Sequence, residues 1–197
     1  MRQRDKRIID TLSMFRCMTR DQIADLFFST NKSKTSNCNL VLKRLRRDGY
    51  IQADTTTQPY VYYPNPASTK IGGQKTNHYL LIVDFYKQIL MYGYPKEFIV
   101  EPKFQKGEPE PDIYMHWKGA PWFIEIQRSI YSEKMITDKI KRYESYFLSD
   151  KWTEKRNHFG HVWLITEREY NVKSEHFRVF QSKDVNEFMD KNAIKDQ

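Results

Sequence analysis

Two acidic residues, each at the edge of a strand-like apolar segment, suggest a divalent-metal site. Asp112 directly precedes the apolar residues 113–115, and Glu125 lies within the apolar segment 122–127. Two carboxylates on neighbouring strands can bind one Mg²⁺, because hard divalent cations prefer oxygen ligands. Such a metal lowers the pKa of a bound water and directs that water against a phosphodiester. The pair therefore predicts a nuclease site, with Asp112 and Glu125 as metal ligands and Mg²⁺ or Mn²⁺ as cofactor.

A third acid is expected to join this pair. Alternation along the strand-like segment 98–104 puts Glu101 and Lys103 on one face. Glu125 and Gln127 share a face of their own strand in the same way. If the strands are adjacent, Glu101 becomes a third metal ligand beside the first two acids.

The position two residues after Glu125 departs from the usual pattern. Sites of this kind carry a lysine there, which adds positive charge and orients the nucleophile, but this chain has Gln127. The amide of Gln127 can hydrogen-bond a water and supplies no charge. Lys103 is the first candidate to replace that charge, and Lys134 and Lys139 on the following predicted helix are the second candidates.

Positive charge is concentrated in the N-terminal third of the chain. The net charge of the 197 residues is +8. Residues 1–60 hold 12 Lys and Arg against 6 Asp and Glu, whereas the remainder is close to neutral. A basic segment before a near-neutral one indicates a module that binds a polyanion, and nucleic acid is the polyanion we expect.

The pattern of this basic segment predicts a winged helix-turn-helix. A first helix is indicated by the apolar stripe Ile8, Leu12 and Phe15. Thr19 begins a second helix, and Gln22 completes a capping box with it. A third helix is expected over residues 35–48, with Leu40, Val41 and Leu45 pointing inward and Gly49 at its C-terminal end. A hairpin over 50–63 would form the wing.

The outer face of the third helix is expected to enter the major groove of double-stranded DNA while the wing touches the backbone. Lys and Arg would contact phosphates, and Asn or Thr would reach base edges. The residues assigned to this interface are Lys34, Thr35, Asn37, Asn39, Lys43, Arg44, Arg46 and Arg47. Two other interpretations stay open: a solvated helix face, and a winged helix that docks a protein.

The rest of the chain predicts a sheet with helices on it. Residues 67–77 are poor in apolar side chains and are interpreted as a linker. The periodicity then predicts helices over 78–92, 132–148 and 184–190 and strands over 98–104, 111–115, 122–127, 161–166 and 177–180. Ile136, Ile140, Tyr143 and Phe147 are the expected buried stripe of the helix over 132–148.

Cysteine use and hydropathy indicate the compartment. Cys17 and Cys38 are two lone cysteines without a Cys-x-x-Cys motif, which favours a reducing cytoplasm over a disulfide or zinc site. No apolar run approaches the roughly 20 residues needed to span a bilayer. We therefore expect a cytoplasmic chain with no membrane partner.

Together these segments resemble the PD-(D/E)xK nuclease superfamily. Pro111-Asp112 and Glu125-Ile126-Gln127 stand in its motif positions, and the predicted element order matches its core. The resemblance implies that Asp112 and Glu125 bind metal and that Gln127 occupies the lysine position. The expected fold is α+β: a winged helix-turn-helix over 1–66, the linker, and a restriction-endonuclease-like α/β domain over 78–197.

The whole chain is also similar to the replication-relaxation family of plasmids and integrative elements. The matching features are residues 19–27, 42–45 and 49–51, the helix from His78, and the acidic pair. The resemblance implies a role in replication, relaxation or transfer of such elements, with DNA and a replication or relaxase protein as partners.

Three functional hypotheses follow from these features. The first is a DNA-processing protein that cleaves DNA with Mg²⁺. The second is a non-catalytic accessory factor or transcriptional regulator that carries a degenerate nuclease fold. The third is a protein-docking adaptor. A homodimer that reads two half-sites is a further expectation, because many winged-helix proteins bind DNA in that way.

Overall fold

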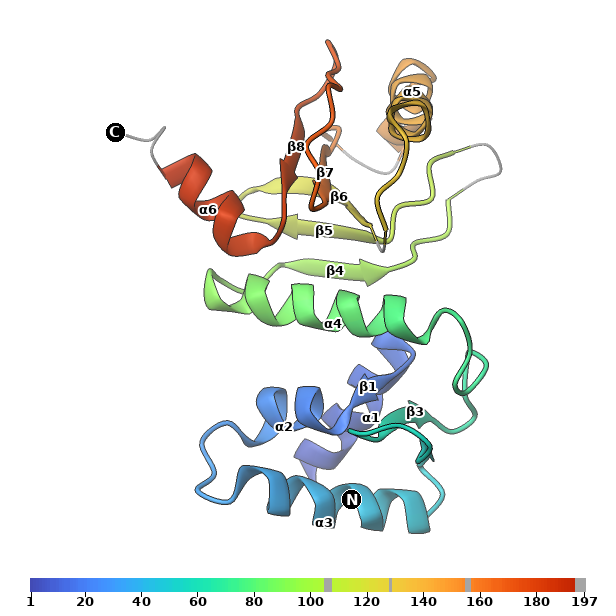
Figure 1. The fold of residues 1–197 in the computed structure, drawn as a ribbon, viewed down its shortest axis with the longest axis vertical. Coiled ribbons are helices and arrows are strands. Elements are labelled where there is room, and N and C mark those ends of the chain that lie inside the picture. The colour runs from blue at the N-terminus through green and yellow to red at the C-terminus, as the bar shows by residue number, and fades with distance from the viewer. Residues whose placement is uncertain (105–107, 128, 155–156, 194–197) are drawn as a thin grey trace. The chain divides into compact units, whose positions relative to one another are not determined.

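The structure is a computed structural model that describes residues 1–104, 108–127, 129–154 and 157–193. The chain divides into two compact units, Met1–Lys87 and Gln88–Gln197. Its described residues form a mixed α+β protein with two sheets and six α-helices (Figure 1). The division falls within helix α4 (Thr76–Met91), later along the chain than the predicted linker over 67–77.

Three helices form most of unit 1. They are α1 (Gln3–Phe15), α2 (Arg20–Phe28) and α3 (Lys34–Arg47). The predicted capping box at the start of α2 is confirmed: the Thr19 hydroxyl accepts the N–H of Gln22 at 3.1 Å, and the Gln22 side chain accepts the N–H of Thr19 at 3.0 Å. Helix α1 buries its predicted stripe, Ile8, Leu12 and Phe15. In α2 the predicted Ile23 is buried, but Ala24 and Phe28 take the other inward positions, and Leu26 and Phe27, which the pattern also places on the apolar face, are only partly buried.

The prediction for the buried face of α3 was partly wrong. Val41 and Leu45 are buried as expected, but Leu40 is 69% exposed, and Cys38 and Leu42 take the inward positions instead. Residues three and four apart share a helix face, so Cys38, Leu42 and Leu45 form one stripe and exclude Leu40 from it.

A small antiparallel sheet completes the fold of unit 1. The predicted hairpin is present as β2 (Ile51–Asp54) and β3 (Val61–Pro64), with Ile51 opposite Pro64 and Asp54 opposite Val61. A two-residue strand that the sequence did not predict, β1 (Met18–Thr19), pairs with the other side of β3. Gly49 joins α3 to the hairpin at φ 78, a left-handed conformation that glycine adopts without strain.

Unit 2 is built on a five-stranded sheet in the order β4-β5-β6-β7-β8. The strands are β4 (Glu97–Val100), β5 (Ile113–Trp117), β6 (Ala120–Ile126), β7 (His161–Ile165) and β8 (Val179–Ser182). The first three run antiparallel, and β6, β7 and β8 run parallel to one another. Helix α5 (Glu133–Leu148) makes the crossover from β6 to β7.

The strands of unit 2 lie where the sequence predicts them, but their boundaries differ by one to four residues, most of all at the end of β4. β4 ends at Val100 and not at residue 104, because Glu101 has a φ of 45 and Pro102 cannot donate a ladder hydrogen bond. β8 begins at Val179 and not at residue 177. A short 3-10 helix (Lys151–Glu154) and helix α6 (Val185–Ala193) complete the described elements.

Helix α5 and helix α6 contribute to two aromatic clusters in unit 2. Ile136, Ile140 and Tyr143 of α5 belong to one buried cluster with Phe123 of β6 and Leu164 of β7. Tyr146 is the fourth buried residue of α5, while the predicted Phe147 is only partly buried. The second cluster joins Trp117, Trp122 and Trp163 of the sheet to Phe188 of α6. Alternation along β6 separates Trp122 from Phe123 and so assigns the two clusters to opposite faces of the sheet.

Both cysteines are free and buried in unit 1. Burial raises the pKa of Cys17 and of Cys38 to about 12, so both remain protonated thiols at neutral pH. Among the helices that the structure describes, none combines the length and the apolar character that a membrane crossing requires.

Candidate functional site

The carboxylate of Glu125 is the centre of a buried polar cluster in unit 2. It lies on β6 and is 2% exposed. Its Oε2 accepts a hydrogen bond from Lys139 Nζ at 2.5 Å, and its Oε1 accepts one from the Tyr143 hydroxyl at 2.6 Å. Both donors belong to α5, so the helix that crosses the sheet also supplies both partners of the acid.

The charges of this cluster depend on one another. Burial raises the pKa of Glu125, the Lys139 ammonium opposes that rise, and the Asp112 carboxylate adds to it. Burial disfavours the Lys139 ammonium as well, but the Glu125 and Asp112 carboxylates outweigh it and raise the pKa of Lys139. Burial and Glu125 raise the pKa of Tyr143 well above its ordinary value. The hydroxyl therefore keeps its proton and donates a hydrogen bond to Glu125.

Asp112 is held immediately before β5. Its Oδ2 accepts the N–H of Ile126 at 2.7 Å, which joins the acid to the end of β6. Its carbonyl accepts the N–H of Glu101 at 2.8 Å, so the backbone after β4 is also adjacent. Asp112 and Glu125 are therefore close, as their sequence spacing predicts, and Asp112 is near enough to disfavour the charge on Glu125.

Gln127 belongs to a different hydrogen-bond network. Its Oε1 accepts hydrogen bonds from the Thr166 hydroxyl at 2.9 Å and from the Tyr170 hydroxyl at 3.2 Å. Its Nε2 is buried without a hydrogen-bond partner among the residues that the structure describes. The side chain that follows the second acid is thus fixed by Thr166 and Tyr170.

The lysine at this site is Lys139 rather than Lys103. Lys103 is exposed beyond the end of β4, because that strand stops four residues earlier than the sequence predicts. Lys139 was a second candidate on the sequence alone. The signal that favours it is its place beside Ile136, Ile140 and Tyr143, which is the buried stripe of α5.

The hydrogen-bond partners of Glu125 compete with a divalent metal ion for its carboxylate. Both oxygens of Glu125 already accept short hydrogen bonds, one of them from an ammonium that neutralises the acid. Across the described ranges, no three or more His, Cys, Asp or Glu side chains lie close enough to bind one ion. Mg²⁺ is commonly bound through one or two carboxylates, with water and phosphate oxygens as its other ligands, and at Glu125 the Lys139 ammonium already supplies a cation beside the carboxylate.

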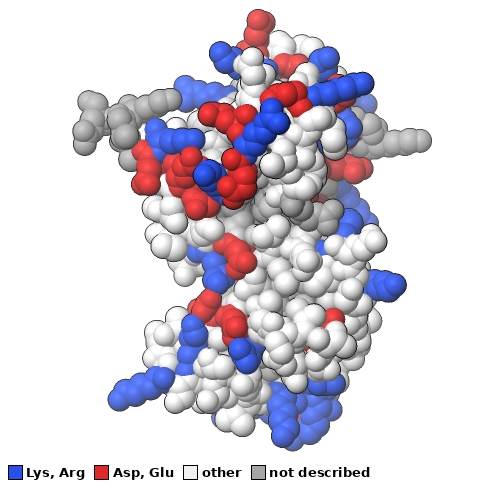
Figure 2. All heavy atoms as spheres, in the orientation of Figure 1, with Lys and Arg blue, Asp and Glu red and all other residues white. Residues whose placement is uncertain are grey.

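A second site is a basic groove in unit 1, between α3 and the β2–β3 hairpin. The residues that line it are Arg20, Asn39, Leu42, Lys43, Arg46, Arg47, Gln58, Tyr60 and Tyr62. Figure 2 shows Lys and Arg side chains gathered at the lower end of the view, where Figure 1 draws α3. The groove thus combines four cations with amide and aromatic side chains.

The eight residues predicted to bind DNA have different surroundings. Four of them line the groove: Asn39, Lys43, Arg46 and Arg47. Thr35 is exposed and Asn37 half-buried at the start of α3. Lys34 and Arg44 instead form ion pairs within unit 1, with Asp25 and with Asp5 respectively.

Arg44 has a structural role that its sequence pattern does not reveal. Asp5 of α1 is 1% exposed, and its Oδ2 accepts a hydrogen bond from the Arg44 guanidinium at 2.5 Å. A buried carboxylate without a cationic partner is strongly destabilising. Arg44 therefore stabilises the contact of α1 with α3, and its charge is not available to the groove.

Of the four groove cations, two form ion pairs with acidic side chains of the described residues and two do not. Arg20 and Arg47 pair with the exposed carboxylates of the residues that follow them, Asp21 and Asp48, each at 2.8 Å. Lys43 and Arg46 form no ion pair with any residue in the described part of the chain. Arg20 of α2 and Gln58, Tyr60 and Tyr62 of the hairpin segment are not among the residues that the sequence assigns to the interface, because their place in the groove depends on how α2 and the hairpin pack beside α3.

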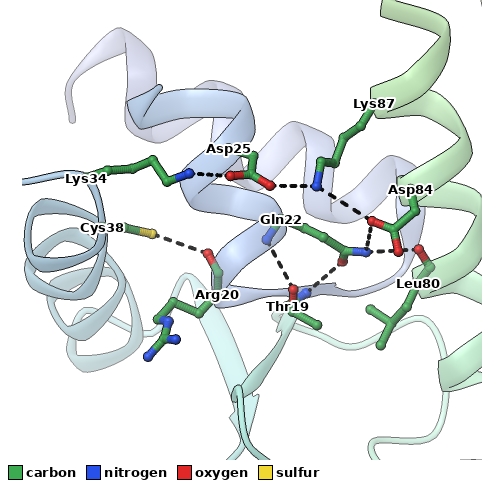
Figure 3. Close-up of polar contacts among 9 residues, drawn as sticks. All are labelled: Thr19, Arg20, Gln22, Asp25, Lys34, Cys38, Leu80, Asp84 and Lys87. Atoms are coloured by element: carbon green, nitrogen blue, oxygen red, sulfur yellow. Dashed lines mark hydrogen bonds and ion pairs between the residues drawn. The ribbon is translucent and has the colours of Figure 1, made fainter. Parts of the chain in front are cut away.

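A polar network fixes α2 and α3 against the first part of α4 within unit 1 (Figure 3). The Gln22 amide donates to the Leu80 carbonyl at 2.9 Å and to Asp84 at 3.0 Å. Asp25 lies between Lys34 of α3 and Lys87 of α4 and pairs with both. Burial tends to raise the pKa of Asp25, but these two ammonium groups outweigh it and lower that pKa. The network explains why α4 up to Lys87 belongs to unit 1.

Comparison with known proteins identifies a family. A family model described as replication-relaxation matches residues 9–162. No curated protein matches the chain, and no solved structure matches it.

Proposed function

Since the chain belongs to the replication-relaxation family, we propose that it is a DNA-binding protein of plasmid or mobile-element replication, relaxation or transfer. In this proposal unit 1 is a winged helix-turn-helix that binds double-stranded DNA. The observation that carries the proposal is the basic groove. Lys43 and Arg46 line it, and neither forms an ion pair with an acidic residue in the described part of the chain.

The contrast between the cations of α3 supports this assignment. Lys34 and Arg44 are neutralised by Asp25 and Asp5 inside the unit. Lys43 and Arg46 are exposed and line the groove together. Like charges that gather without counter-charges repel one another, and a phosphate backbone relieves that repulsion and releases bound counterions.

The arrangement of the elements supports the same function. Three helices followed by an antiparallel hairpin is the order of a winged helix, in which the third helix enters the major groove. Asn39 is exposed on α3 beside the cations and can reach a base edge, and Gln58 and Tyr60 of the hairpin segment can contact the backbone.

For unit 2 we propose a PD-(D/E)xK-like fold that does not cleave DNA. The antiparallel β4-β5-β6 meander and the α5 crossover to parallel β7 support that fold. The ion pair of Glu125 with Lys139 and its bond to Tyr143 support a non-catalytic role, because they occupy the acid that a metal would need. The chain is then an accessory factor rather than an endonuclease.

Fluorescence anisotropy with labelled duplex DNA at a series of salt concentrations tests the DNA-binding function. Binding through phosphates gives an association constant that falls steeply with salt, by roughly 0.9 logarithmic units per contact and per tenfold change. A chain that does not bind duplex DNA, or binds it without salt dependence, is instead a protein-docking adaptor.

A further inference from the structure

An aliphatic side chain lies in the middle of the outer face of α3. That face is the stripe Ser36, Leu40, Lys43 and Arg47, at the i, i+4, i+7 and i+11 spacing of one helix face. All four are exposed, and the buried residues of α3 lie on the opposite side. Leu40 is 69% exposed and contributes little to the core of unit 1.

The position of Leu40 is more informative than its exposure. Single exposed leucines are common on protein surfaces. Leu40, however, has a small hydroxyl residue one turn before it and two cations, Lys43 and Arg47, one and two turns after it. An apolar side chain bordered by cations is complementary to a binding partner that presents an apolar group surrounded by negative charge.

We propose that Leu40 reads DNA sequence by contacting the C5-methyl group of thymine in the major groove. The inference rests on the proposed DNA-binding function. The thymine methyl is the apolar group that unmodified base pairs present in the major groove, whose other groups are hydrogen-bond donors and acceptors. Leucine has no donor or acceptor, so the methyl is what it can recognise there, while Lys43 and Arg47 contact the flanking phosphates.

A second copy of the chain fits this face less well. A symmetric contact through α3 would bring the same surface of both copies together. Lys43 and Arg47 of one copy would then lie near the same cations of the other, and like charges in close contact repel. Duplex DNA supplies the opposite charge and so fits the stripe better.

Thymine-to-uracil substitution tests the contact directly, because uracil differs from thymine by that methyl alone. Duplexes that bind the full chain are first enriched from a randomised pool. Dissociation constants are then measured for an enriched duplex and for versions with one thymine at a time replaced by uracil. The proteins are the wild type, Leu40→Ala and Leu148→Ala, the last a matched control at a leucine of unit 2 that is 64% exposed.

The wild type and Leu148→Ala are expected to bind about fourfold more weakly when one particular thymine loses its methyl. Leu40→Ala is expected to bind the thymine duplex more weakly and to respond to no uracil substitution. Alanine is a strong helix former at an exposed position, so the variant should keep its circular dichroism spectrum and melting temperature.

Two results would overturn the inference while leaving the DNA-binding function intact. One is a Leu40→Ala variant with wild-type affinity and the full response to uracil. The other is a variant whose affinity is unchanged but whose sedimentation shows loss of self-association, which would assign Leu40 to a contact between copies. A wild type that enriches no duplex would overturn the proposed function itself.

Discussion

The Lys139 ammonium lies 2.5 Å from the buried Glu125 carboxylate, and this ion pair is the centre of the buried polar cluster of unit 2. The lysine comes from the helix that covers the acid and not from the position two residues later, where Gln127 stands. Tyr143, one helical turn after Lys139, donates to the other carboxylate oxygen. A single helix therefore supplies both the ammonium that pairs with the acid and the hydroxyl that donates to its other oxygen.

Replacing Lys139 by Met should lower stability in a pH-dependent way. Burial raises the pKa of Glu125 above its ordinary value of 4.5, and removal of the ammonium raises it further. An acid with a raised folded-state pKa gives its full stability below 4.5 and loses it as pH rises through the folded pKa. We expect Lys139→Met to lose about 3 kcal/mol at pH 7, measured by urea unfolding, and much less in acid.

The double variant Lys139→Met/Glu125→Gln is the control for that experiment. It carries no titratable acid at the site, so the additional pH dependence should disappear. A Lys139→Met protein whose unfolding free energy matches the wild type at every pH would show that the pair does not stabilise unit 2.

Divalent metal should neither bind the acidic pair nor promote cleavage. Supercoiled, linear and branched DNA incubated with Mg²⁺ or Mn²⁺ should stay intact with both the wild type and Asp112→Ala. Water-proton relaxation should report no Mn²⁺ bound at Glu125, because Lys139 and Tyr143 occupy its oxygens. Metal-dependent cleavage by the wild type that is absent in Asp112→Ala would instead establish an endonuclease.

Local signals in the sequence predict the helices and strands of this chain well. The Thr19–Gln22 capping box involves residues three apart, so no tertiary contact is needed to recognise it. The hairpin and the strand that carries Glu125 are likewise predicted from local signals, since each is a short apolar run beside a polar turn segment. The proximity of Asp112 to Glu125 follows from two neighbouring strands.

The features that the sequence predicts wrongly or leaves open are those that depend on tertiary contacts. Residues 40–42 are apolar in succession, so periodicity alone does not decide which of them faces inward, and Leu40 was placed on the wrong side. The role of Arg44 depends on Asp5, which is distant in sequence. The role of Lys139 likewise depends on how α5 crosses the sheet above Glu125.

Arg44→Ala should destabilise unit 1 without changing the salt dependence of DNA binding. The substitution removes the guanidinium that donates a hydrogen bond to the buried Asp5 carboxylate and leaves it the more distant ion pair with Arg4, at 3.6 Å, which we expect to cost about 1–3 kcal/mol of unfolding free energy. Urea unfolding measures that cost, and anisotropy titrations measure the salt slope. A shallower salt slope at unchanged stability would place Arg44 at the DNA interface after all.

Gln22→Ala should also destabilise unit 1, by about 1–2 kcal/mol. The variant removes half of the capping box and both hydrogen bonds that the Gln22 amide donates to α4. Asp21→Ala is the matched control, because Asp21 is exposed in the same helical turn and pairs only with its neighbour Arg20 among the described residues. Equal melting temperatures for the two variants would contradict the role of Gln22.

The DNA-binding groove is tested most directly by the salt dependence of duplex affinity for one pair of double variants. Lys43→Ala/Arg46→Ala removes two groove cations, and Lys141→Ala/Arg142→Ala removes two exposed cations of α5 with the same change in charge. The groove variant should bind more weakly and lose roughly 2 from the logarithmic salt slope, while the control keeps the wild-type slope. Equal slopes for the two variants would contradict DNA binding through this groove.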